Sequence, residues 1–442
     1  MRILQVSCAC DPFHRGGVAQ LVRRIGGRLA SRGHRVCVFT VMHDRRRPAG
    51  DVYYKDVDGC CVAALNEPVD GDFLARYRVE DYLNPKVHEP FRRLVEEFAP
   101  DAVHFHAIQG MGAGLLNWVP AGVPAVLTMH DYWWVCPNIF LTRLDESLCS
   151  LQRPDLSACE QCLRPLALSH PDHAVGFGEL DHRARFLGRQ LKRFDRIMTV
   201  SGQIRDRLAG FLPELDIEVC ENGIEWDDRR SNTARRGSSG RVESGLVRFG
   251  FLGGMNRLKG FECLMRAVQR VGKPDFQVVV YGCATAWRSR IGQAVPGLRR
   301  VYRSMRGRNG QDAGLGPDSH VSFRPHFRAG DRDHVFGSLD VLLVPSMVRE
   351  SFSLVCREAL VAGVPVIASR CGGPEEIIRH EENGLLFEPG DADGLAACMT
   401  RCLDEPDLLR TLRSGANSEG IRTLAEQVDQ LTEVYRAVGG RA

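Results

Sequence analysis

The chain has 442 residues, more than one hydrophobic core accommodates, so we expect two domains. Hydrophobic residues at 44% and charged residues at 26% are ordinary for a globular protein, and a net charge of +3 argues against a nucleic-acid partner. No apolar run reaches the roughly 18 residues of a membrane-spanning helix, and the first residues follow a strand pattern rather than a signal peptide. We therefore expect a cytoplasmic protein, with peripheral contact to the inner face of the membrane left open.

The first half of the chain alternates short apolar runs with helical patterns, which is the rhythm of β–α–β units. Helices are expected at Gly17–Arg32, which stops at Gly33, and at Pro90–Ala99. The expected strands are Arg2–Ser7, Arg35–Val41, Cys60–Leu65, Ala102–His106, Ala125–His130 and Arg196–Val200.

Residues 231–245 are polar and rich in glycine and serine, so they predict a flexible loop, and the β–α rhythm then restarts. This pattern predicts an α/β protein with Rossmann-like domains at 1–224 and 225–420, and a helix in 421–442 that packs back on the first domain. The expected elements are strands Val247–Leu252, Phe276–Tyr281, His320–Phe323, Asp340–Val344 and Pro365–Ala368, and helices Gly260–Val271, Leu354–Ala362, Pro374–Arg379, Asp391–Leu403 and Ala425–Val438.

One segment interrupts this rhythm. Trp287–Arg308 carries seven arginines and no acidic residue. It is either a solvated surface insertion or a basic patch for a phosphate-bearing acceptor, an anionic lipid surface or a partner.

Two glutamates, Glu350 and Glu358, lie eight positions apart at the junction between an apolar strand pattern and a helix pattern. Eight residues span a little over two helical turns, so both carboxylates can face this junction. The junction lies at the carboxyl end of an expected parallel strand, where open α/β sheets bind ligands. The residues between them include Ser351, Phe352, Ser353 and Leu354.

This E-x7-E pattern and its flanking segments resemble the retaining glycosyltransferases of family 4, which include glycogen synthase and phosphatidylinositol mannosyltransferase-like enzymes. The resemblance implies a GT-B fold, in which two Rossmann-like domains face a central cleft. It also implies a nucleotide-diphosphate sugar donor, foremost a UDP- or GDP-sugar, and transfer to an acceptor hydroxyl with retention of configuration. Ser351 and Ser353 replace a more usual glycine and proline of that pattern.

Three glycine-containing loops extend the resemblance. Gly16 and Gly17 open the first helix, where backbone N–H groups favour an anion, although a simple tight turn is the alternative. Lys259 stands at the start of a later helix, and its charge suits a diphosphate. Gly254 occupies the place where the family often has an arginine, so either Arg257 supplies the second cation or Lys259 and backbone groups alone hold the diphosphate. The third loop contains Gly372 and Gly373.

The expected strand Ala125–His130 ends in polar and aromatic residues. The resemblance places His130 beside the donor sugar, with a purely structural histidine as the alternative. The residues that follow it, Asp131, Tyr132 and Trp133, are the candidates for acceptor contacts, and His104 and His106 are weaker site candidates.

The resemblance implies distinct roles for these residues. Glu350 would bind hydroxyls of the donor sugar and Glu358 the ribose, and Lys259 would stabilise the leaving diphosphate. We assign catalytic roles to His130, Glu350 and Lys259. The first domain has no Asp-x-Asp pattern at a strand end, so we expect no catalytic metal and no catalytic cofactor. The expected donor-binding residues are Gly16, Gly17, Arg257, Lys259, Glu350, Ser351, Phe352, Ser353, Leu354, Glu358, Gly372 and Gly373.

Most of the sixteen cysteines are scattered singly, but Cys136, Cys149, Cys159 and Cys162 follow His130 in a turn-rich stretch. Four thiolates with a terminal C-x2-C spacing fit a tetrahedral structural zinc site. Free thiols and a disulfide are the alternatives. Four thiolates leave no open coordination position, which argues against a catalytic zinc.

The acceptor is not encoded in any motif that we can identify. The resemblance favours the biosynthesis of cell-surface polysaccharide, glycolipid or glycoconjugate. The alternatives are a transferase acting on a small-molecule natural product and an inactive scaffold that binds a sugar or nucleotide, which the missing arginine at Gly254 favours.

Overall fold

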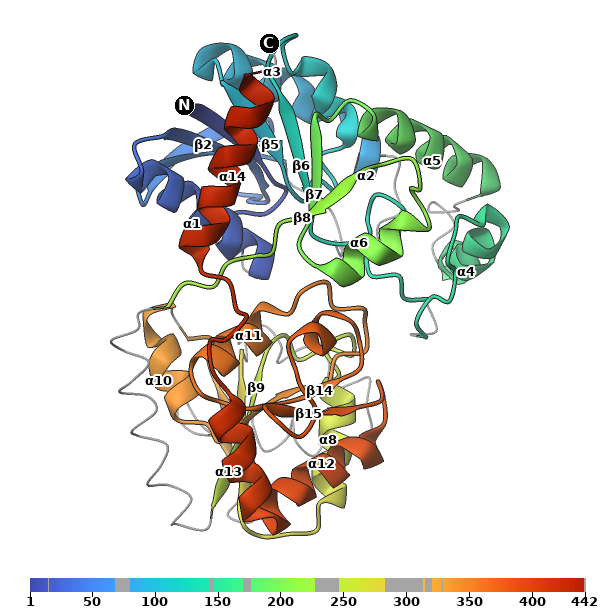
Figure 1. Cartoon of the computed structure of the whole chain (residues 1–442). Helices are drawn as coiled ribbons and strands as arrows, with labels where there is room; N and C mark the ends of the chain where they lie inside the picture. Colours follow the sequence, from blue (N-terminus) through green and yellow to red (C-terminus); the bar gives the residue numbers. More distant parts are fainter. Residues whose placement is uncertain are drawn as a thin grey trace. The chain divides into compact units, whose positions relative to one another are not determined.

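The computed structural model describes residues 1–14, 16–67, 80–143, 147–169, 176–226, 246–282, 313–314, 320–327 and 329–440 (Figure 1). The chain divides into two compact units. Unit 1 comprises Met1–Glu225 and Arg422–Ala442, and unit 2 comprises Trp226–Ile421. Each unit is described by itself below.

Unit 1 is built on an eight-stranded sheet with the order β3-β4-β2-β1-β5-β6-β7-β8. All neighbouring strands are parallel except β3 and β4, which pair antiparallel. The central strands β1, β2, β5 and β6 are mainly apolar and, apart from the first residues of β1 and β2, buried, as expected of a parallel sheet that is covered on both faces. The strands are β1 Arg2–Val6, β2 Arg35–Met42, β3 Val52–Val57, β4 Cys60–Asn66, β5 Ala102–Phe105, β6 Ala125–Met129, β7 Arg196–Thr199 and β8 Ile217–Val219.

Helices α1, α3 and α14 of unit 1 each bury an apolar stripe. In α1, Leu21, Ile25 and Leu29 recur at helical spacing and are fully buried. The helices are α1 Gly17–Ser31, α2 Glu80–Leu83, α3 His88–Phe98, α4 Leu156–Ser169, α5 Phe177–Leu191, α6 Gly202–Ala209 and α14 Leu424–Gly439, with 3-10 turns at Pro85–Val87 and Ala113–Trp118.

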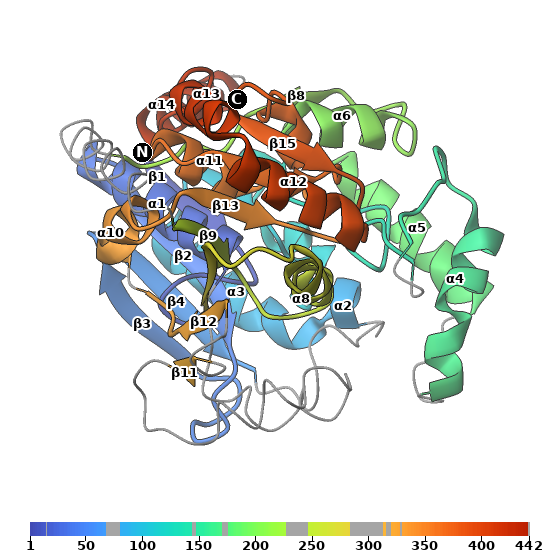
Figure 2. The ribbon, with the colours of Figure 1, turned by 90° about the horizontal axis from the view of Figure 1, so that it is seen from below.

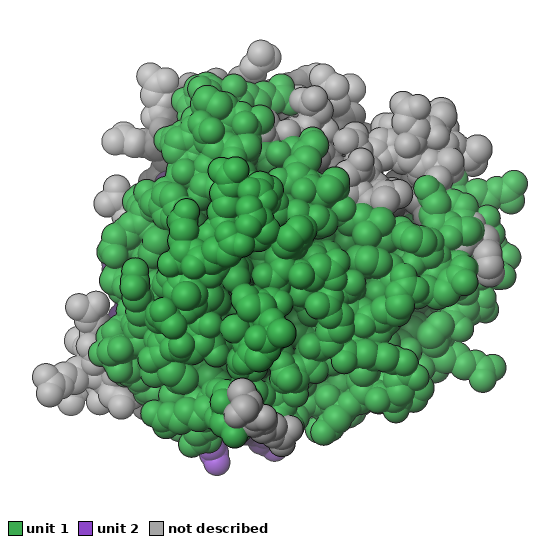
Figure 3. All heavy atoms as spheres, turned by 90° about the horizontal axis from the view of Figure 1, so that it is seen from above, with its two compact units in different colours: residues 1–225, 422–442 green, residues 226–421 purple. Residues whose placement is uncertain are grey.

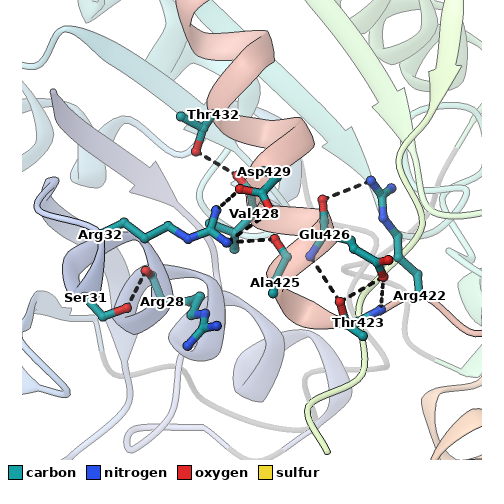
Figure 4. A network of polar contacts seen from close by, with 10 residues as sticks. All are labelled: Arg28, Ser31, Arg32, Arg422, Thr423, Ala425, Glu426, Val428, Asp429 and Thr432. Carbon is teal, nitrogen blue, oxygen red and sulfur yellow. Dashed lines mark hydrogen bonds and ion pairs between the residues drawn. The ribbon is translucent and has the colours of Figure 1, made fainter.

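The C-terminal helix α14 belongs to unit 1, and Figure 3 colours it with residues 1–225. Its residues Val428, Leu431 and Tyr435 are buried in the same apolar cluster as α1 and the central strands. At the rim, Arg32 pairs with Asp429 and donates a hydrogen bond of 3.2 Å to the carbonyl oxygen of Ala425 (Figure 4). Helices α1 and α14 therefore lie side by side (Figure 1).

Unit 2 is built on a seven-stranded sheet with the order β11-β12-β10-β9-β13-β14-β15, parallel except for the pair β11 and β12. Helices α8 and α12 pack against each other (Figure 2). The strands are β9 Val247–Leu252, β10 Phe276–Tyr281, β11 Ala313–Gly314, β12 Val321–Arg324, β13 Val341–Val344, β14 Val366–Ser369 and β15 Gly384–Phe387. The helices are α8 Phe261–Arg270, α10 Arg332–Gly337, α11 Leu354–Val361, α12 Ala392–Asp404 and α13 Pro406–Gly415, with 3-10 turns at Ala329–Asp331 and Gly373–Glu376.

The structure corrects the sequence interpretation at several elements. The expected helix Pro374–Arg379 is only the 3-10 turn Gly373–Glu376, because Asn383 accepts a hydrogen bond from the Arg379 N–H and diverts the chain. The edge strand β3 and the helices α4, α5, α6 and α13 are not among the expected elements. The predicted loop 231–245 and the arginine-rich segment 287–308 lie outside the described residues. Among the helices that the structure describes, none combines the length and apolar character needed to cross a membrane.

Candidate active site

The candidate residues of unit 2 follow three neighbouring strands. The loop that contains Lys259 follows β9, Glu350 follows β13, and Gly372 and Gly373 follow β14. From β9 the chain first adds β10 and β12 on one side of β9. It then returns and adds β13 on the other side, so β9 and β13 are adjacent in the sheet. This reversal is the topological switch point, and open α/β sheets bind ligands at its carboxyl edge.

Lys259 and Glu350 meet at this switch point. The Nζ atom of Lys259 lies 2.7 Å from Oε1 of Glu350, which also accepts a hydrogen bond of 2.6 Å from the Ser346 hydroxyl. The Glu350 side chain is 12% exposed, whereas that of Lys259 is 42% exposed. The carboxylate is thus buried, whereas part of the Lys259 side chain is exposed to solvent.

Both members of this pair are charged at neutral pH. Burial raises the pKa of Glu350, but the Lys259 charge and the hydrogen bonds from Lys259 and Ser346 outweigh burial and leave the pKa lowered. Burial lowers the pKa of Lys259, but the charge and hydrogen bond of Glu350 outweigh it and leave the pKa raised.

The backbone around Glu350 is held by the loop after β14. The Glu350 N–H donates to Cys371 at 2.8 Å, and the Gly373 N–H donates to the Glu350 carbonyl oxygen at 2.7 Å. A Cβ on Gly373 would stand 2.6 Å from backbone atoms of Phe352, so only glycine permits this approach. Gly260 is similarly constrained, because its φ is 73° and a Cβ would overlap the carbonyl group of Pro345.

The segment between the two glutamates has a strained turn. Ser353, the residue before α11, adopts φ 58° and ψ 77°, in the left-handed region that favours glycine. Phe352 is buried beneath the Arg357 guanidinium, which lies 3.5 Å from the ring centroid and donates to the Phe352 carbonyl oxygen. Ser351 is half-buried, and Leu354 begins α11.

Two further charged candidates already have partners in unit 2. Glu358 on α11 pairs with Arg332 on α10 at 3.0 Å, and both side chains are mostly buried. Arg257 lies 3.6 Å from Glu262 of α8 and is 66% exposed, so its guanidinium faces solvent beside the helix start. The structure therefore groups Lys259 with Glu350, and Glu358 with Arg332.

The candidate residues of unit 1 also gather at a topological switch point. Gly16 caps the start of α1 after β1, with φ 149°, and Gly17 is the first helical residue. His106 follows β5 and His130 follows β6, and the strands β1, β5 and β6 are neighbours. These residues therefore share the carboxyl edge of the first sheet.

Three buried histidines form a connected cluster at this edge. Nε2 of His130 lies 3.0 Å from Nδ1 of His106, and the rings of His106 and His104 are 4.0 Å apart. His104 contacts the Tyr435 hydroxyl at 2.7 Å and the Thr128 hydroxyl at 2.8 Å. Within the described part of the chain, Nδ1 of His130 and Nε2 of His106 are buried and have no hydrogen-bond partner.

Burial keeps these histidines neutral. It lowers the pKa of His130 to about 4 and that of His104 to about 3, and it lowers that of His106 as well. At neutral pH each ring therefore has one donor and one acceptor nitrogen.

The residues proposed for acceptor contacts differ in their surroundings. Tyr132 and Trp133 are 4% exposed, and the Arg183 guanidinium of α5 lies 5.3 Å from a ring centroid of Trp133. Both side chains are therefore part of the core of unit 1 rather than an exposed surface. Asp131 is less buried, and burial raises its pKa to about 6.

The four cysteines singled out in the sequence are half-buried free thiols in the structure. All four line one cavity of about 30 Å3 in unit 1. In the described ranges, no three His, Cys, Asp or Glu side chains are arranged to hold a metal ion as they stand.

The fold defines the class of protein. Sucrose-phosphate synthase from Thermosynechococcus elongatus superposes with a TM-score of 0.69 at 21% identity over 100% of both chains. HepE from Anabaena, solved with UDP and glucose, superposes with a TM-score of 0.60 at 18% identity, covering 98% of each chain. The chain therefore has the GT-B fold of glycosyltransferases, as the sequence predicts.

Sequence comparison identifies the family. A model described as Glycosyltransferase Family 4 matches residues 15–228, and one described as Glycosyl transferases group 1 matches residues 247–405. D-inositol 3-phosphate glycosyltransferase from Pseudarthrobacter chlorophenolicus is 26% identical over 397 residues, which cover 88% of this chain and 83% of that protein. The chain belongs to the glycosyltransferases of family 4.

Three residues that contact the candidate residues were not predicted from the sequence. Ser346 anchors Glu350, Arg332 pairs with Glu358, and Arg183 covers Trp133. Ser346 directly follows the β13 pattern and precedes Glu350 by four residues, which is a usable signal. Arg332 and Arg183 have no local pattern that distinguishes them from surface arginines.

Proposed function

We propose that this protein is a retaining glycosyltransferase that moves a hexosyl group from a nucleotide-diphosphate sugar to an acceptor hydroxyl. The observation that carries this proposal is the ion pair between Lys259 and Glu350 at the switch point of unit 2. A buried carboxylate accepts hydrogen bonds from sugar hydroxyls, and an adjacent ammonium group attracts a diphosphate.

Lys259 is suited to the leaving group because its side chain is partly exposed and remains charged. It stands immediately before Gly260 and the N-terminus of α8, where the helix dipole also favours negative charge. In this proposal Lys259 and the backbone of this loop stabilise the diphosphate, so catalysis needs no divalent metal.

His130 would orient the transferred sugar from unit 1. Its ring is neutral, so Nδ1 can either donate to or accept from a sugar hydroxyl without the cost of burying a charge. Nδ1 is the ring nitrogen of His130 that does not contact His106.

The proposed reaction proceeds on one face of the donor sugar. The bond between the anomeric carbon and the diphosphate oxygen breaks, and the acceptor oxygen bonds to the same carbon from the same side. The acceptor proton passes to the departing phosphate oxygen, so no protein nucleophile or base is required. The protein contributes by positioning the reactants and by stabilising the charge that develops on the diphosphate.

For the donor we favour a UDP-sugar, with a GDP-sugar as the second choice, and the UDP found with HepE supports the first. We further propose that the product belongs to cell-surface polysaccharide, glycolipid or glycoconjugate biosynthesis. The reaction would then take place in the cytoplasm or at the inner face of the membrane.

The test is nucleotide release from a panel of UDP-, GDP-, ADP-, dTDP- and CDP-sugars by the wild type and by Lys259→Met. We expect release from one donor class, a large loss in the variant, and a product whose anomeric configuration, read by NMR, matches that of the donor. Lys273→Met is the matched control, because Lys273 is 44% exposed and pairs with Asp404 at 2.8 Å. Inversion of configuration would refute the retaining mechanism.

An inactive scaffold that binds a nucleotide is the second candidate, and Gly254 at the position of the family's arginine favours it. Calorimetric binding of a nucleotide sugar without release, in the presence of a panel of polyol, glycan and lipid acceptors, would support this candidate and contradict the transferase.

A further inference from the structure

Cys136, Cys149, Cys159 and Cys162 come together from three local structures of unit 1. Cys136 lies in the turn after β6, where its N–H donates to Tyr132 at 2.8 Å. Cys149 follows Leu148, which pairs antiparallel with Thr142. Cys159 and Cys162 lie on α4 three residues apart, so they share one face of that helix.

The cavity that the four cysteines line has the size of a site for one small ion. Its volume of about 30 Å3 exceeds what a single water-sized sphere requires. The other lining residues are mainly apolar, among them Val135, Leu141, Leu163 and Phe211. A small cavity with four sulfur atoms and apolar walls matches the donor preference of Zn2+, which binds thiolates at about 2.3 Å in a tetrahedral arrangement.

We propose that these four cysteines bind one structural Zn2+ ion. On binding, the four thiols release four protons to solvent and four Zn–S bonds form, which leaves a site with a net charge of −2. In the structure, the four thiol groups are not close enough together to ligate one metal ion. Binding would therefore require the four sulfurs to move toward one another within the cavity that they share, by changes of side-chain rotamer.

The surroundings supply the groups that such an anionic site needs. The backbone N–H of Asn138 donates a hydrogen bond to the Cys136 sulfur. Burial raises the pKa of Cys136 to about 12 and that of Cys159 to about 11, and the positive charge of the buried Arg183 side chain of α5 opposes this effect at both thiols. Hydrogen bonds to ligand sulfurs and a nearby compensating charge are typical supports of metal sites.

The local backbone indicates what the ion would stabilise. Ile139 and Leu141 adopt φ values of 55° and 47°, which are unfavourable for branched side chains. They lie between Cys136 and Cys149, in the segment that directly follows His130. An ion bound by four ligands would cross-link this segment to α4 and offset its strain. The inference stands independently of the proposed function, since it concerns only the order of this segment.

The experiment measures metal content by plasma mass spectrometry in the full chain purified without chelators. We expect about one zinc per chain in the wild type and loss of it in Cys159→Ser/Cys162→Ser. The matched control is Cys398→Ser, which replaces another half-buried cysteine, on α12 of unit 2, and should retain the zinc. Replacing zinc by Co2+ in the wild type should produce thiolate charge-transfer absorption and the strong d–d bands of a tetrahedral site.

Several outcomes would overturn the inference. The inference is wrong if the wild-type protein contains no stoichiometric zinc and gives no cobalt spectrum. This test uses the wild type alone, so it remains valid even if the double variant fails to fold. Iron in place of zinc, or disulfides found among these cysteines after alkylation without reductant, would also refute it. A folded double variant that keeps its zinc would place the metal elsewhere.

Discussion

Nε2 of His130 lies 3.0 Å from Nδ1 of His106, and both rings are buried and neutral. One of these two nitrogens must bear the proton and the other must accept it. The contact therefore fixes the orientation of the His130 ring and couples its tautomer to that of His106. His106 is a positioning residue in this arrangement, since it acts on the proposed sugar site only through His130.

Replacing His106 by leucine should lower kcat/KM about fivefold, because one buried hydrogen bond contributes about 1 kcal/mol and about 1.4 kcal/mol corresponds to a factor of ten. His106→Asn should restore part of the loss, since the amide can replace one ring nitrogen. Steady-state kinetics with the donor found in the panel would measure both variants.

Tyr435→Phe is the control for this prediction. It removes a hydroxyl 2.7 Å from His104, at the far side of the same cluster, and should cost stability without changing kcat/KM. A folded His106→Leu variant with wild-type kcat/KM would contradict the positioning role.

The same cluster predicts a loss of stability in mild acid. Burial lowers the pKa of His130 from 6.5 to about 4 and that of His104 to about 3 in the folded state. As the pH falls below 6.5, the unfolded chain takes up protons at these residues and the folded chain does not. The free energy of unfolding is therefore highest above pH 6.5 and should fall toward pH 4, by roughly 1.4 kcal/mol per pH unit for each proton.

Urea unfolding at intervals from pH 8 to pH 5 measures this slope, and the window lies above the range in which Glu350 takes up a proton. A variant that combines His104→Asn with His106→Asn should have a shallower slope, whatever its stability at pH 8. Asp131, whose pKa burial raises to about 6, takes up a proton in the folded state and opposes this slope, so the wild type is compared with Asp131→Asn. A flat curve between pH 7 and pH 5 in Asp131→Asn would mean that these rings are protonated in the folded protein.

Lys259→Met should lower the free energy of unfolding by about 1–2 kcal/mol, because Glu350 is then left in its pocket without a countercharge. This is less than the loss for a fully buried pair, since Lys259 is 42% exposed and its interaction is screened by solvent. Adding Glu350→Gln should recover part of the loss.

Lys273→Met provides the comparison in urea unfolding as well. Its partner Asp404 is 49% exposed, so the loss should stay within about 0.5 kcal/mol. Equal losses for the two lysine variants would show that Lys259 and Glu350 are no more than a surface pair.

Ser353→Gly should stabilise unit 2 by about 1 kcal/mol, because it removes the steric cost of φ 58°. Ala99→Gly is the matched control in unit 1, since Ala99 ends α3 with φ 46° and should give a similar gain. Thermal unfolding of both variants measures the effect. If only Ser353→Gly is destabilising, the serine hydroxyl, which donates to the Cys356 sulfur at 3.1 Å, stabilises the turn by more than its conformation costs.

Much of the fold follows from local pattern. The central parallel strands are buried on both faces, so they appear in the sequence as short continuous apolar runs with glycine stops between them, and β9 and β10 have the expected bounds. The edge strand β3 was missed because its pattern, Val52–Val57, contains mostly exposed polar and aromatic residues. Helices α4, α5 and α6 were not predicted because their sequences show no clear apolar stripe.

The candidate site was predictable where it depends on strand order. Lys259 and Glu350 follow the first and fourth parallel strands of unit 2, which are neighbours in a sheet of Rossmann order, so their approach follows from the motif positions. The pairing of Glu358 with Arg332 was not predictable, since it depends on how α10 packs against α11. The burial of Trp133 is a similar case, because the residue that covers it, Arg183, lies fifty positions later on α5.

The return of α14 to unit 1 has a consequence for biosynthesis. Residues 1–225 emerge from the ribosome before residues 226–421, and α14 follows last. At 5–20 residues per second this delay is roughly 10–40 s, during which Ile25, Val36 and their neighbours lack the cover of Leu431 and Tyr435. The nascent first unit therefore presents an apolar face to chaperones and to other nascent chains until α14 is made, and a stop codon just before Leu424 would damage the first unit rather than the second.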